Sequence, residues 1–172
     1  MSVAEQSAAE LKKGLIAAIP KLRAFAVSLS GNSDRADDLV QETLTKALQN
    51  LGSFDVGSNL LAWLFTILRN TYYSEFRKRQ REVPDADGTY TASLVTKPEQ
   101  EYHVEFLDLH KALQALPADQ REALILIGAI GMSYDEAANI CHCAVGTVKS
   151  RVSRARQRLN NVLTLPPRSR QD

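Results

Sequence analysis

Five basic side chains within a single predicted helix near the C-terminal end of the chain are the ones best suited to binding chemistry: Lys149, Arg151, Arg154, Arg156 and Arg158. No acidic residue lies between Ala137 and Leu163 to neutralise them. Lysine and arginine hold phosphates, and arginine also reads base edges in the major groove. This pattern predicts a helix that contacts nucleic acid, although a basic face that is merely solvated is the alternative.

The elements that must position this helix form a predicted helix-turn-helix. Ser133 can cap a first helix, in which Asp135 and Glu136 suit the positive end of the dipole. Small apolar residues give that helix a face that a second helix can cross closely. The second helix has an apolar stripe at helical spacing, which is expected to be buried against the first. These inward residues are Ala137, Ala138 and Ile140, then Val148, Val152 and Ala155.

The turn between the two helices is Cys141-His142-Cys143, and Gly146-Thr147 is expected to open the second helix. A cysteine-histidine-cysteine run raises the possibility of zinc. Structural zinc needs four ligands, however, and the other histidines, His103 and His110, lie on a different segment. We therefore expect small turn-filling residues, with no metal, no cofactor and no disulfide. No catalytic set is recognisable either, since phosphate loops and nucleophile elbows are missing from the sequence.

Length and composition indicate a globular chain of one medium domain or two small ones. The 172 residues are 44% hydrophobic and 24% charged, with a net charge of +1. The charge is uneven: the basic helix and Arg77–Arg81 contrast with an acidic middle from Val83 to Asp108. The sequence contains neither an apolar run of the length of a membrane span nor the pattern of a signal peptide, so a cytoplasmic protein is expected.

Helical periodicity returns along most of the chain, which predicts an all-α fold. An apolar series from Leu11 to Leu29 is interrupted by Pro20, so we expect a short helix before the proline and another beginning near it. Gly31-Asn32-Ser33 should end this stretch and cap the next helix, residues 34–50. That helix has an inner stripe of Val40, Leu44, Ala47 and Leu51 and an acidic outer face.

A long helix is expected over residues 60–81. Its first half is apolar nearly all round, and its second half combines aromatic residues with a basic end. Aromatic rings beside cations suit single-stranded nucleic acid, because bases stack on the rings while the cations hold phosphates. The alternative is that Tyr72 and Phe76 belong to the core and only Tyr73 is exposed, which we favour for Phe76.

Periodicity stops between these helices and the C-terminal half, which divides the chain into two helical domains. We expect a first domain over residues 10–82, a flexible acidic linker over 83–103 and a second domain over 104–165. In the second domain, one helix to Leu116 precedes a nearly all-apolar helix that starts after Pro117 and stops at Gly131. This apolar helix should pack beneath the helix-turn-helix.

The order of these segments resembles the group IV, or extracytoplasmic-function (ECF), sigma factors of bacterial RNA polymerase. In region 2 the resemblance lies in residues 37–43, in Ala62-Trp63-Leu64 and in Ile67-Leu68-Arg69-Asn70. In region 4 it lies in Leu116-Pro117, Arg121-Glu122, residues 134–138 and residues 146–156. Residues 22–26 and 63–70 further resemble the alphaproteobacterial general-stress-response (EcfG-like) subgroup.

The resemblance implies roles for individual residues, by analogy with the family. Contacts to core polymerase would come from Asp37, Asp38, Leu39, Gln41 and Glu42. The −10 element would be bound by Asn70 and Tyr73 near an unstacked base and by phosphate contacts from Arg77, Lys78, Arg79 and Arg81. The −35 element would be bound by Thr147, Lys149, Ser150, Arg151 and Arg154.

The partners that the resemblance implies are core RNA polymerase, through its β′ coiled coil and β flap, promoter DNA and an anti-sigma factor. The chain would be a monomer when free, would touch no membrane and would be no enzyme, since the polymerase performs the catalysis. Two alternatives remain: a repressor or activator that binds duplex DNA alone, and a protein-interaction adaptor. The turn Cys141-His142-Cys143 departs from the commoner Leu-Gly-Ile type of the family.

Overall fold

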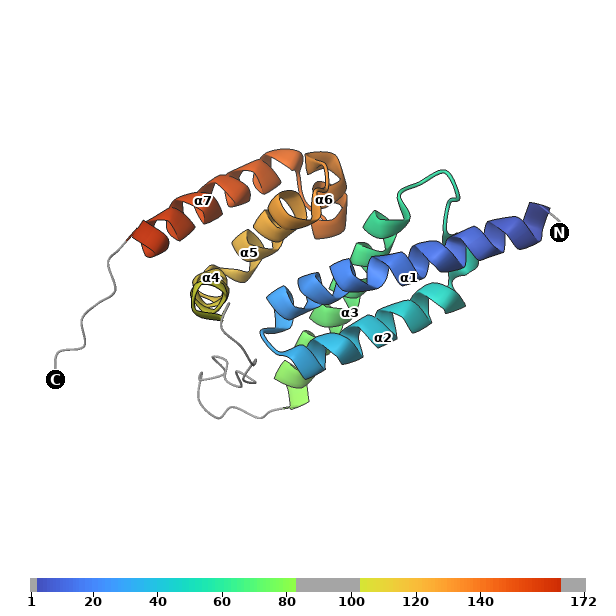
Figure 1. Cartoon of the computed structure of the whole chain (residues 1–172), viewed down its shortest axis with the longest axis horizontal. Coiled ribbons are helices and arrows are strands. Elements are labelled where there is room, and N and C mark those ends of the chain that lie inside the picture. The colour runs from blue at the N-terminus through green and yellow to red at the C-terminus, as the bar shows by residue number, and fades with distance from the viewer. Residues whose placement is uncertain (1–2, 83–102, 165–172) are drawn as a thin grey trace.

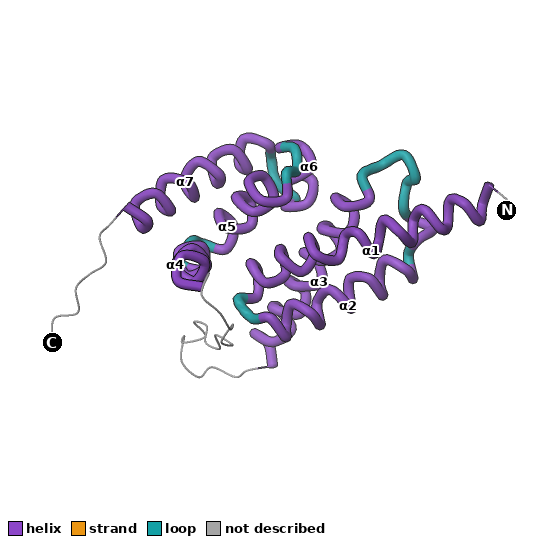
Figure 2. Tube along the Cα trace, in the orientation of Figure 1, coloured by secondary structure: helices purple, strands orange, loops and turns teal. Residues whose placement is uncertain are grey.

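The computed structural model describes residues 3–82 and 103–164, and these residues fold as helices joined by short turns (Figures 1 and 2). The described residues contain no strand, so the predicted all-α fold is confirmed. None of the helices in these two ranges is long and apolar enough to cross a bilayer. The expected linker, residues 83–103, lies outside the described residues except for His103, with which the second half begins.

The N-terminal half is a bundle of three helices, α1 (Val3–Ser30), α2 (Ser33–Gln49) and α3 (Leu60–Glu82). Its centre is formed by Leu22, Phe25, Leu64, Phe65 and Leu68, all fully buried. The rings of Phe25 and Phe65 meet edge to face, with centroids 5.0 Å apart, an arrangement that aromatic quadrupoles favour. This bundle contains Trp63, as the sequence predicted.

The prediction that α1 is broken at Pro20 is wrong, because the helix runs through the proline. A proline inside a helix removes one backbone hydrogen bond and crowds the preceding turn. Here the residues on both sides of it, Leu15 and Ala18 before and Leu22 and Phe25 after, are buried in the same core. Packing along the whole length therefore outweighs the local cost, and Pro20 itself is exposed.

The start of α2 follows the predicted cap. Gly31 takes a left-handed conformation (φ 68°), and the Asn32 side chain accepts a hydrogen bond from the Arg35 backbone N–H at 2.9 Å. The buried face of α2 comprises Ala36, Leu39, Val40, Thr43 and Ala47. Val40 and Ala47 were predicted to be there, whereas Leu44 and Leu51 are only half-buried.

Helix α3 spans the predicted range, but its aromatic residues are arranged differently. Phe76, expected in the core, is 42% exposed, whereas Tyr73 is half-buried. Tyr72 is also half-buried and donates a hydrogen bond from its hydroxyl to the Leu29 carbonyl at 2.9 Å, which ties α3 to the end of α1. The reversal arises because the C-terminal half covers the side of α3 on which Tyr73 lies.

The C-terminal half comprises α4 (His103–Gln114), α5 (Ala118–Ile125), a π-helical turn (Leu126–Ile130), α6 (Tyr134–Cys141) and α7 (Val145–Thr164). Gly131, with φ at 82°, ends the π-helical turn where the sequence predicted a stop. Helix α5 packs against α7 and thus lies beneath the helix-turn-helix, as expected.

The two halves lie side by side (Figure 1) and pack against each other through α3 with α6 and α1 with α5. Their buried apolar side chains form one contiguous cluster. Each half nevertheless keeps its own helices and its own share of that cluster. The contact between the halves covers part of α3, the helix whose second half the sequence assigned to nucleic acid, so its polar groups need a closer description.

Candidate nucleic-acid interface

The helix-turn-helix begins with a complete capping box. The Ser133 hydroxyl accepts from the Glu136 backbone N–H at 3.1 Å, and the Glu136 carboxylate accepts from the Ser133 backbone N–H at 2.8 Å. Two of the backbone donors at the start of α6 are thereby satisfied. The N–H groups that Ser133 and then Asn59 direct at this carboxylate lower the pKa of Glu136.

The turn after α6 depends on His142, the one non-glycine residue of the described chain with a positive φ, at 51°. The residue serves as the left-handed cap of α6, a position that glycine and asparagine usually take. The Cys143 backbone N–H then closes the turn onto the Ala138 carbonyl at 3.0 Å. Helix α7 starts at Val145, one residue before the predicted opening at Gly146.

Helix α7 buries the predicted stripe of Val148, Val152 and Ala155 and turns its other faces outward. Among the predicted −35 residues, Lys149 and Arg154 are exposed, and Thr147, Ser150 and Arg151 are half-buried. The Ser150 hydroxyl donates to the Thr147 carbonyl at 2.9 Å. The basic residues that follow, Arg156 and Arg158, are exposed as well, so the outer face of α7 is cationic.

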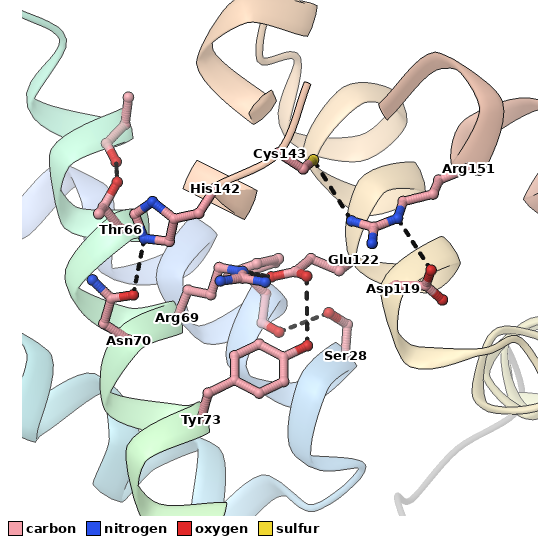
Figure 3. A network of polar contacts seen from close by, with 12 residues as sticks. Ser28, Thr66, Arg69, Asn70, Tyr73, Asp119, Glu122, His142, Cys143 and Arg151 are labelled. Carbon is pink, nitrogen blue, oxygen red and sulfur yellow. Dashed lines mark hydrogen bonds and ion pairs between the residues drawn. The ribbon is translucent and has the colours of Figure 1, made fainter. Parts of the chain in front are cut away.

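Arg151 differs from its neighbours because it is held inside the C-terminal half. Its Nε lies 3.1 Å from Asp119 Oδ2 on α5, and its guanidinium also contacts the Cys143 sulfur at 3.7 Å (Figure 3). These contacts fix the angle between α7 and its support. Arg151 therefore helps to hold α7 against α5, and its predicted contact with DNA stays a prediction.

The corresponding face of the N-terminal half has a hollow of about 600 Å³ between α2, the following loop and α3. Asn70, the predicted base contact, lines it together with Trp63, Thr71 and Lys46. The Lys46 ammonium donates to the Thr71 hydroxyl at 3.1 Å, which joins the two helices at its wall. An aromatic ring, an amide and a cation around one hollow are suited to a nucleic-acid base.

The C-terminal half contacts this face of α3 at a polar junction. The Arg69 Nε donates to Glu122 Oε1 at 2.6 Å, and the Tyr73 hydroxyl lies 3.5 Å from Glu122 Oε2 (Figure 3). Nearby, His142 Nε2 lies 3.2 Å from Asn70 Oδ1. The predicted −10 residues Asn70 and Tyr73 thus contact the second half of their own chain.

Burial dominates the electrostatics of this junction. Glu122 is 0% exposed, and desolvation raises the pKa of its carboxyl although Arg69 opposes that shift. Burial alone would lower the pKa of Arg69, but the attraction and hydrogen bond of Glu122 outweigh it and leave the pKa above its ordinary value. Burial, with the Glu122 charge beside it, raises the pKa of Tyr73 to about 12.

Comparison with known proteins identifies the two halves of the chain. The family model of Sigma-70 region 2 matches residues 15–82, and that of Sigma-70 region 4 matches residues 106–159. The ECF RNA polymerase sigma factor EcfG of Rhodopseudomonas palustris (strain TIE-1) is 63% identical over 153 residues, which cover 89% of this chain and 84% of that protein. The chain belongs to the ECF sigma factors of RNA polymerase.

Two further comparisons place the sigma factor among its relatives. The RNA polymerase sigma-H factor of Pseudomonas aeruginosa is 32% identical over 155 residues, with 83% of this chain and 80% of that protein covered. The sigma factor RpoE from Bartonella quintana, solved in complex with the anti-sigma factor NepR, matches at 56% identity with a TM-score of 0.82. That match covers 91% of this chain and 98% of the other.

The family that the sequence indicated is therefore confirmed, and so is the likeness to EcfG. Sigma factors are transcription initiation factors and not enzymes. The α1–α3 bundle of this sigma factor is its region 2, and the helices from α4 to α7 are its region 4.

The acidic face of α2, predicted to meet core polymerase, is only partly available in this sigma factor. Asp38, Gln41 and Glu42 are exposed, and Asp37 is held by the Arg23 guanidinium at 2.6 Å. Leu39 is only 2% exposed and packs inside region 2. The prediction that Leu39 belongs to this surface is therefore corrected. Leu39 faces the core because it lies on the buried side of α2, one turn after Ala36 and one turn before Thr43.

At the basic end of α3, Arg77, Lys78, Arg79 and Arg81 are all exposed. Arg79 pairs with Glu75 one turn earlier, at 3.7 Å. Beside this basic end, α2 and α3 bring the carboxyl groups of Glu42 and Glu75 together. The pKa of Glu75 is raised, first by burial and then by its neighbour Glu42. The phosphate-contact prediction for these four residues is compatible with their positions.

The cysteines and histidines form no metal-binding cluster with each other or with acids in the described part of the chain. Cys141 is buried, and burial raises the pKa of its thiol to about 12. Cys141 packs in the core of region 4, and the half-buried Cys143 lies beside Arg151. Both are therefore parts of the turn that positions α7.

Sequence reasoning missed Arg69, Glu122 and His142 as site residues. The signal for Arg69 was its place directly after the mostly apolar run from Leu64 to Leu68, because a charge that is buried in such a stretch is almost always paired. Glu122 carried no such signal, since Asp119, Gln120 and Arg121 precede it directly. His142 could have been found from its place at a helix C-terminus, where a left-handed residue is common. The sequence does not reveal which residues those charges pair with.

Proposed function

We propose that this sigma factor binds core RNA polymerase, carries regions 2 and 4 to a promoter and supports DNA melting at the −10 element. The observation that carries the proposal is that one chain has two differently built surfaces, each suited to nucleic acid in its own way. Region 4 has a capped helix-turn-helix with a cationic outer helix, whereas region 2 has a polar and aromatic hollow beside a basic helix end. A repressor that binds intact duplex would need only the first.

In the proposed −10 complex, an unstacked base enters the hollow beside Trp63 and presents its edge to the Asn70 amide. Tyr73 lies outside the lining of this hollow and would contact the strand only after its hydroxyl leaves Glu122. Stacking on an aromatic ring contributes about 1–3 kcal/mol per base, which offsets the few kcal/mol that unstacking costs. Phosphates of the strand are held at the C-terminal end of α3 by Arg77, Lys78, Arg79 and Arg81. These contacts position the strand without reading its sequence.

In the proposed −35 complex, α7 enters the major groove of the duplex. Lys149 and Arg154 project from its exposed face, while Thr147 and Ser150 lie at its N-terminal end, which is the part of a recognition helix that approaches bases. Arg151, held by Asp119, both orients α7 and contributes to −35 recognition.

Core polymerase is proposed to bind through two surfaces. The exposed acids and amide of α2, Asp38, Gln41 and Glu42 with Asp37 beside them, meet the β′ coiled coil, and region 4 meets the β flap. Leu39 is left out of this surface because it is buried. We further propose that the free sigma factor is a cytoplasmic monomer.

Control by an anti-sigma factor, in a stress response, is part of the proposal. Support comes from the Bartonella quintana sigma factor, which was solved with the anti-sigma factor NepR and shares 56% identity and the fold with this chain. The 63% identity to the EcfG protein supports the same assignment.

Run-off transcription with purified core polymerase on a promoter library tests the proposal. We expect transcripts only when the sigma factor and core polymerase are combined, and gel shifts should show strong promoter binding only for the combination. Binding of the chain alone to duplex promoters, with no effect of polymerase, would identify a repressor or activator. Failure to bind DNA or polymerase would identify an adaptor.

Two variants assign the faces in the same assay. Asn70→Ala should weaken selection at −10 and leave −35 preference intact, and Arg154→Ala should do the opposite. Ser153→Ala changes another exposed residue of α7 and is the matched control, which should fold normally and keep both preferences. An Arg154→Ala protein with the −35 preference of the original chain would remove that residue from the proposed interface.

A further inference from the structure

Glu122 is a region 4 residue whose carboxylate contacts two side chains of region 2, Arg69 and Tyr73. Its side chain is fully buried, one carboxylate oxygen accepts from Arg69 and the other lies by the Tyr73 hydroxyl. Arg69 and Glu122 are 53 residues apart in the chain. A buried carboxylate is costly unless it is paired, so this pairing depends on regions 2 and 4 staying together.

Arg69 lies on the same part of α3 as the residues assigned to the −10 strand. It precedes Asn70 directly and is one turn before Tyr73, over whose ring its guanidinium lies at 4.6 Å from the centroid. Only 17% of its side chain is exposed, because region 4 covers it. Without region 4, a guanidinium stacked on tyrosine would face the proposed path of the promoter strand.

On the basis of the proposed function, we propose that Arg69 is a phosphate contact for the promoter strand and that Glu122 occupies its anion-binding position in the free sigma factor. Carboxylate and phosphate oxygens are equivalent acceptors for a guanidinium, which binds both through charge-assisted hydrogen bonds. The two anions cannot occupy the position together. Closing region 4 onto region 2 and holding the −10 strand are therefore mutually exclusive at this residue.

Two more contacts of the same junction would be lost in the same movement. The His142 imidazole contacts the Asn70 side-chain oxygen, and the Asn59 side-chain amide donates to the Glu136 carboxylate at 2.5 Å. Each joins region 2 to the helix-turn-helix. The Asn70 amide would thus contact either the His142 imidazole or a DNA base, just as Arg69 would contact either Glu122 or a phosphate.

The physical balance at this junction allows the exchange. Removing two charges from water offsets much of the attraction between them, so a buried ion pair adds little net stability. Removing only one partner is costly, because it leaves the other charge buried without compensation. We therefore expect that polymerase and DNA can open the closed state, in which region 4 packs on region 2. Loss of the Glu122 charge should make this closed state less stable.

The first test measures binding of the free sigma factor to a fluorescent, mixed-sequence single-stranded DNA, with the distance between regions 2 and 4 followed by energy transfer between attached dyes. Glu122→Gln should increase that distance and tighten DNA binding by at least about fivefold, the lower end of ordinary coupling between sites. Glu10→Gln, an exposed change of the same charge on α1, is the control and should do neither.

The second test asks whether Arg69 is the group that the DNA gains. Adding Arg69→Gln to Glu122→Gln should abolish the tighter binding and reduce the slope of log affinity against log salt by about 0.7, the contribution of one single-strand phosphate. An unchanged slope would overturn the proposal, and so would a Glu122→Gln protein that binds DNA no more tightly than the control.

If Glu122→Gln does not fold, as judged by circular dichroism, the holoenzyme decides the question. Arg69→Gln in complex with core polymerase should lower the salt slope for single-strand binding by the same amount, and an unaltered slope would remove Arg69 from the interface. A wild-type chain that fails in run-off transcription would instead contradict the proposed function, so the two failures are separable.

Discussion

His142 Nε2 lies 3.2 Å from Asn70 Oδ1, which joins the turn of the helix-turn-helix to the residue proposed to read the −10 base (Figure 3). The contact depends on the left-handed backbone of His142, because that conformation ends α6 and directs the side chain towards α3. One residue thus shapes the turn that positions α7 and contacts the face of region 2 that is proposed to bind the −10 strand.

Substitutions at residue 142 should separate these two effects. His142→Gly keeps a residue that adopts a positive φ freely, and His142→Val introduces one that resists it. We expect the valine variant to lower the free energy of unfolding by about 1–2 kcal/mol and the glycine variant to preserve it. Urea denaturation measures the difference; equal losses in both variants would show that backbone strain is not the cause.

The capping box of α6 should make the stability of region 4 depend on pH. Because the folded protein lowers the pKa of Glu136, the carboxylate contributes stability that is complete above the pKa of unfolded glutamate. That contribution is lost as the pH falls through the lower, folded pKa. Glu136→Gln should therefore be less stable than the original chain near neutral pH, and the gap should close in acid.

The measurement for Glu136 is denaturant unfolding at a series of pH values. Ser133→Ala is a companion variant, which removes the hydroxyl cap and should cost about 1 kcal/mol. A difference between the original chain and Glu136→Gln that widens in acid would contradict the assigned direction of the pKa shift.

Two arginines of α7 should respond differently to truncation. Arg154→Ala should weaken −35 duplex binding and reduce the salt slope by about 0.9, with unfolding unchanged, because the side chain is exposed. Arg151→Ala should lower promoter use mainly through the −35 sequence and also lose its pair with the partly exposed Asp119, worth less than about 1 kcal/mol. Filter binding and thermal unfolding distinguish them; an unaltered promoter preference in Arg151→Ala would contradict its role.

Two phenylalanines of α3 provide a matched test of the core. Phe65 is fully buried against Phe25, so Phe65→Ala should cost about 3–5 kcal/mol and unfold region 2 first. Phe76→Ala removes an exposed ring and should change the free energy of unfolding by about 0.5 kcal/mol or less. Comparable losses in the two variants would mean that Phe76 packs more tightly than its exposure indicates.

Features controlled by neighbouring residues in the chain were predictable from sequence. The Ser133 cap, the buried stripe of Val148, Val152 and Ala155, and the stop at Gly131 each follow from local spacing, and all appear in the structure. The helix-turn-helix and the long α3 were found for this reason.

Features controlled by contacts between distant segments were not predictable from one sequence. Pro20 was expected to break a helix by a local rule, but burial on both sides of it keeps α1 continuous. Tyr73 and Phe76 exchanged their expected environments because region 4 covers only one side of α3. The pairing of Arg69 with Glu122 spans 53 residues, and no local pattern connects them.

Trp63 is the only tryptophan of the chain, and it lines the region 2 hollow with its ring 5.1 Å from that of Phe54. The indole emission of the whole protein therefore originates at the place where a promoter base is proposed to stack. Ring stacking on a nucleobase quenches such emission, so strand capture by the sigma factor can be followed in real time on the native chain, without any attached dye, as single-stranded DNA is added.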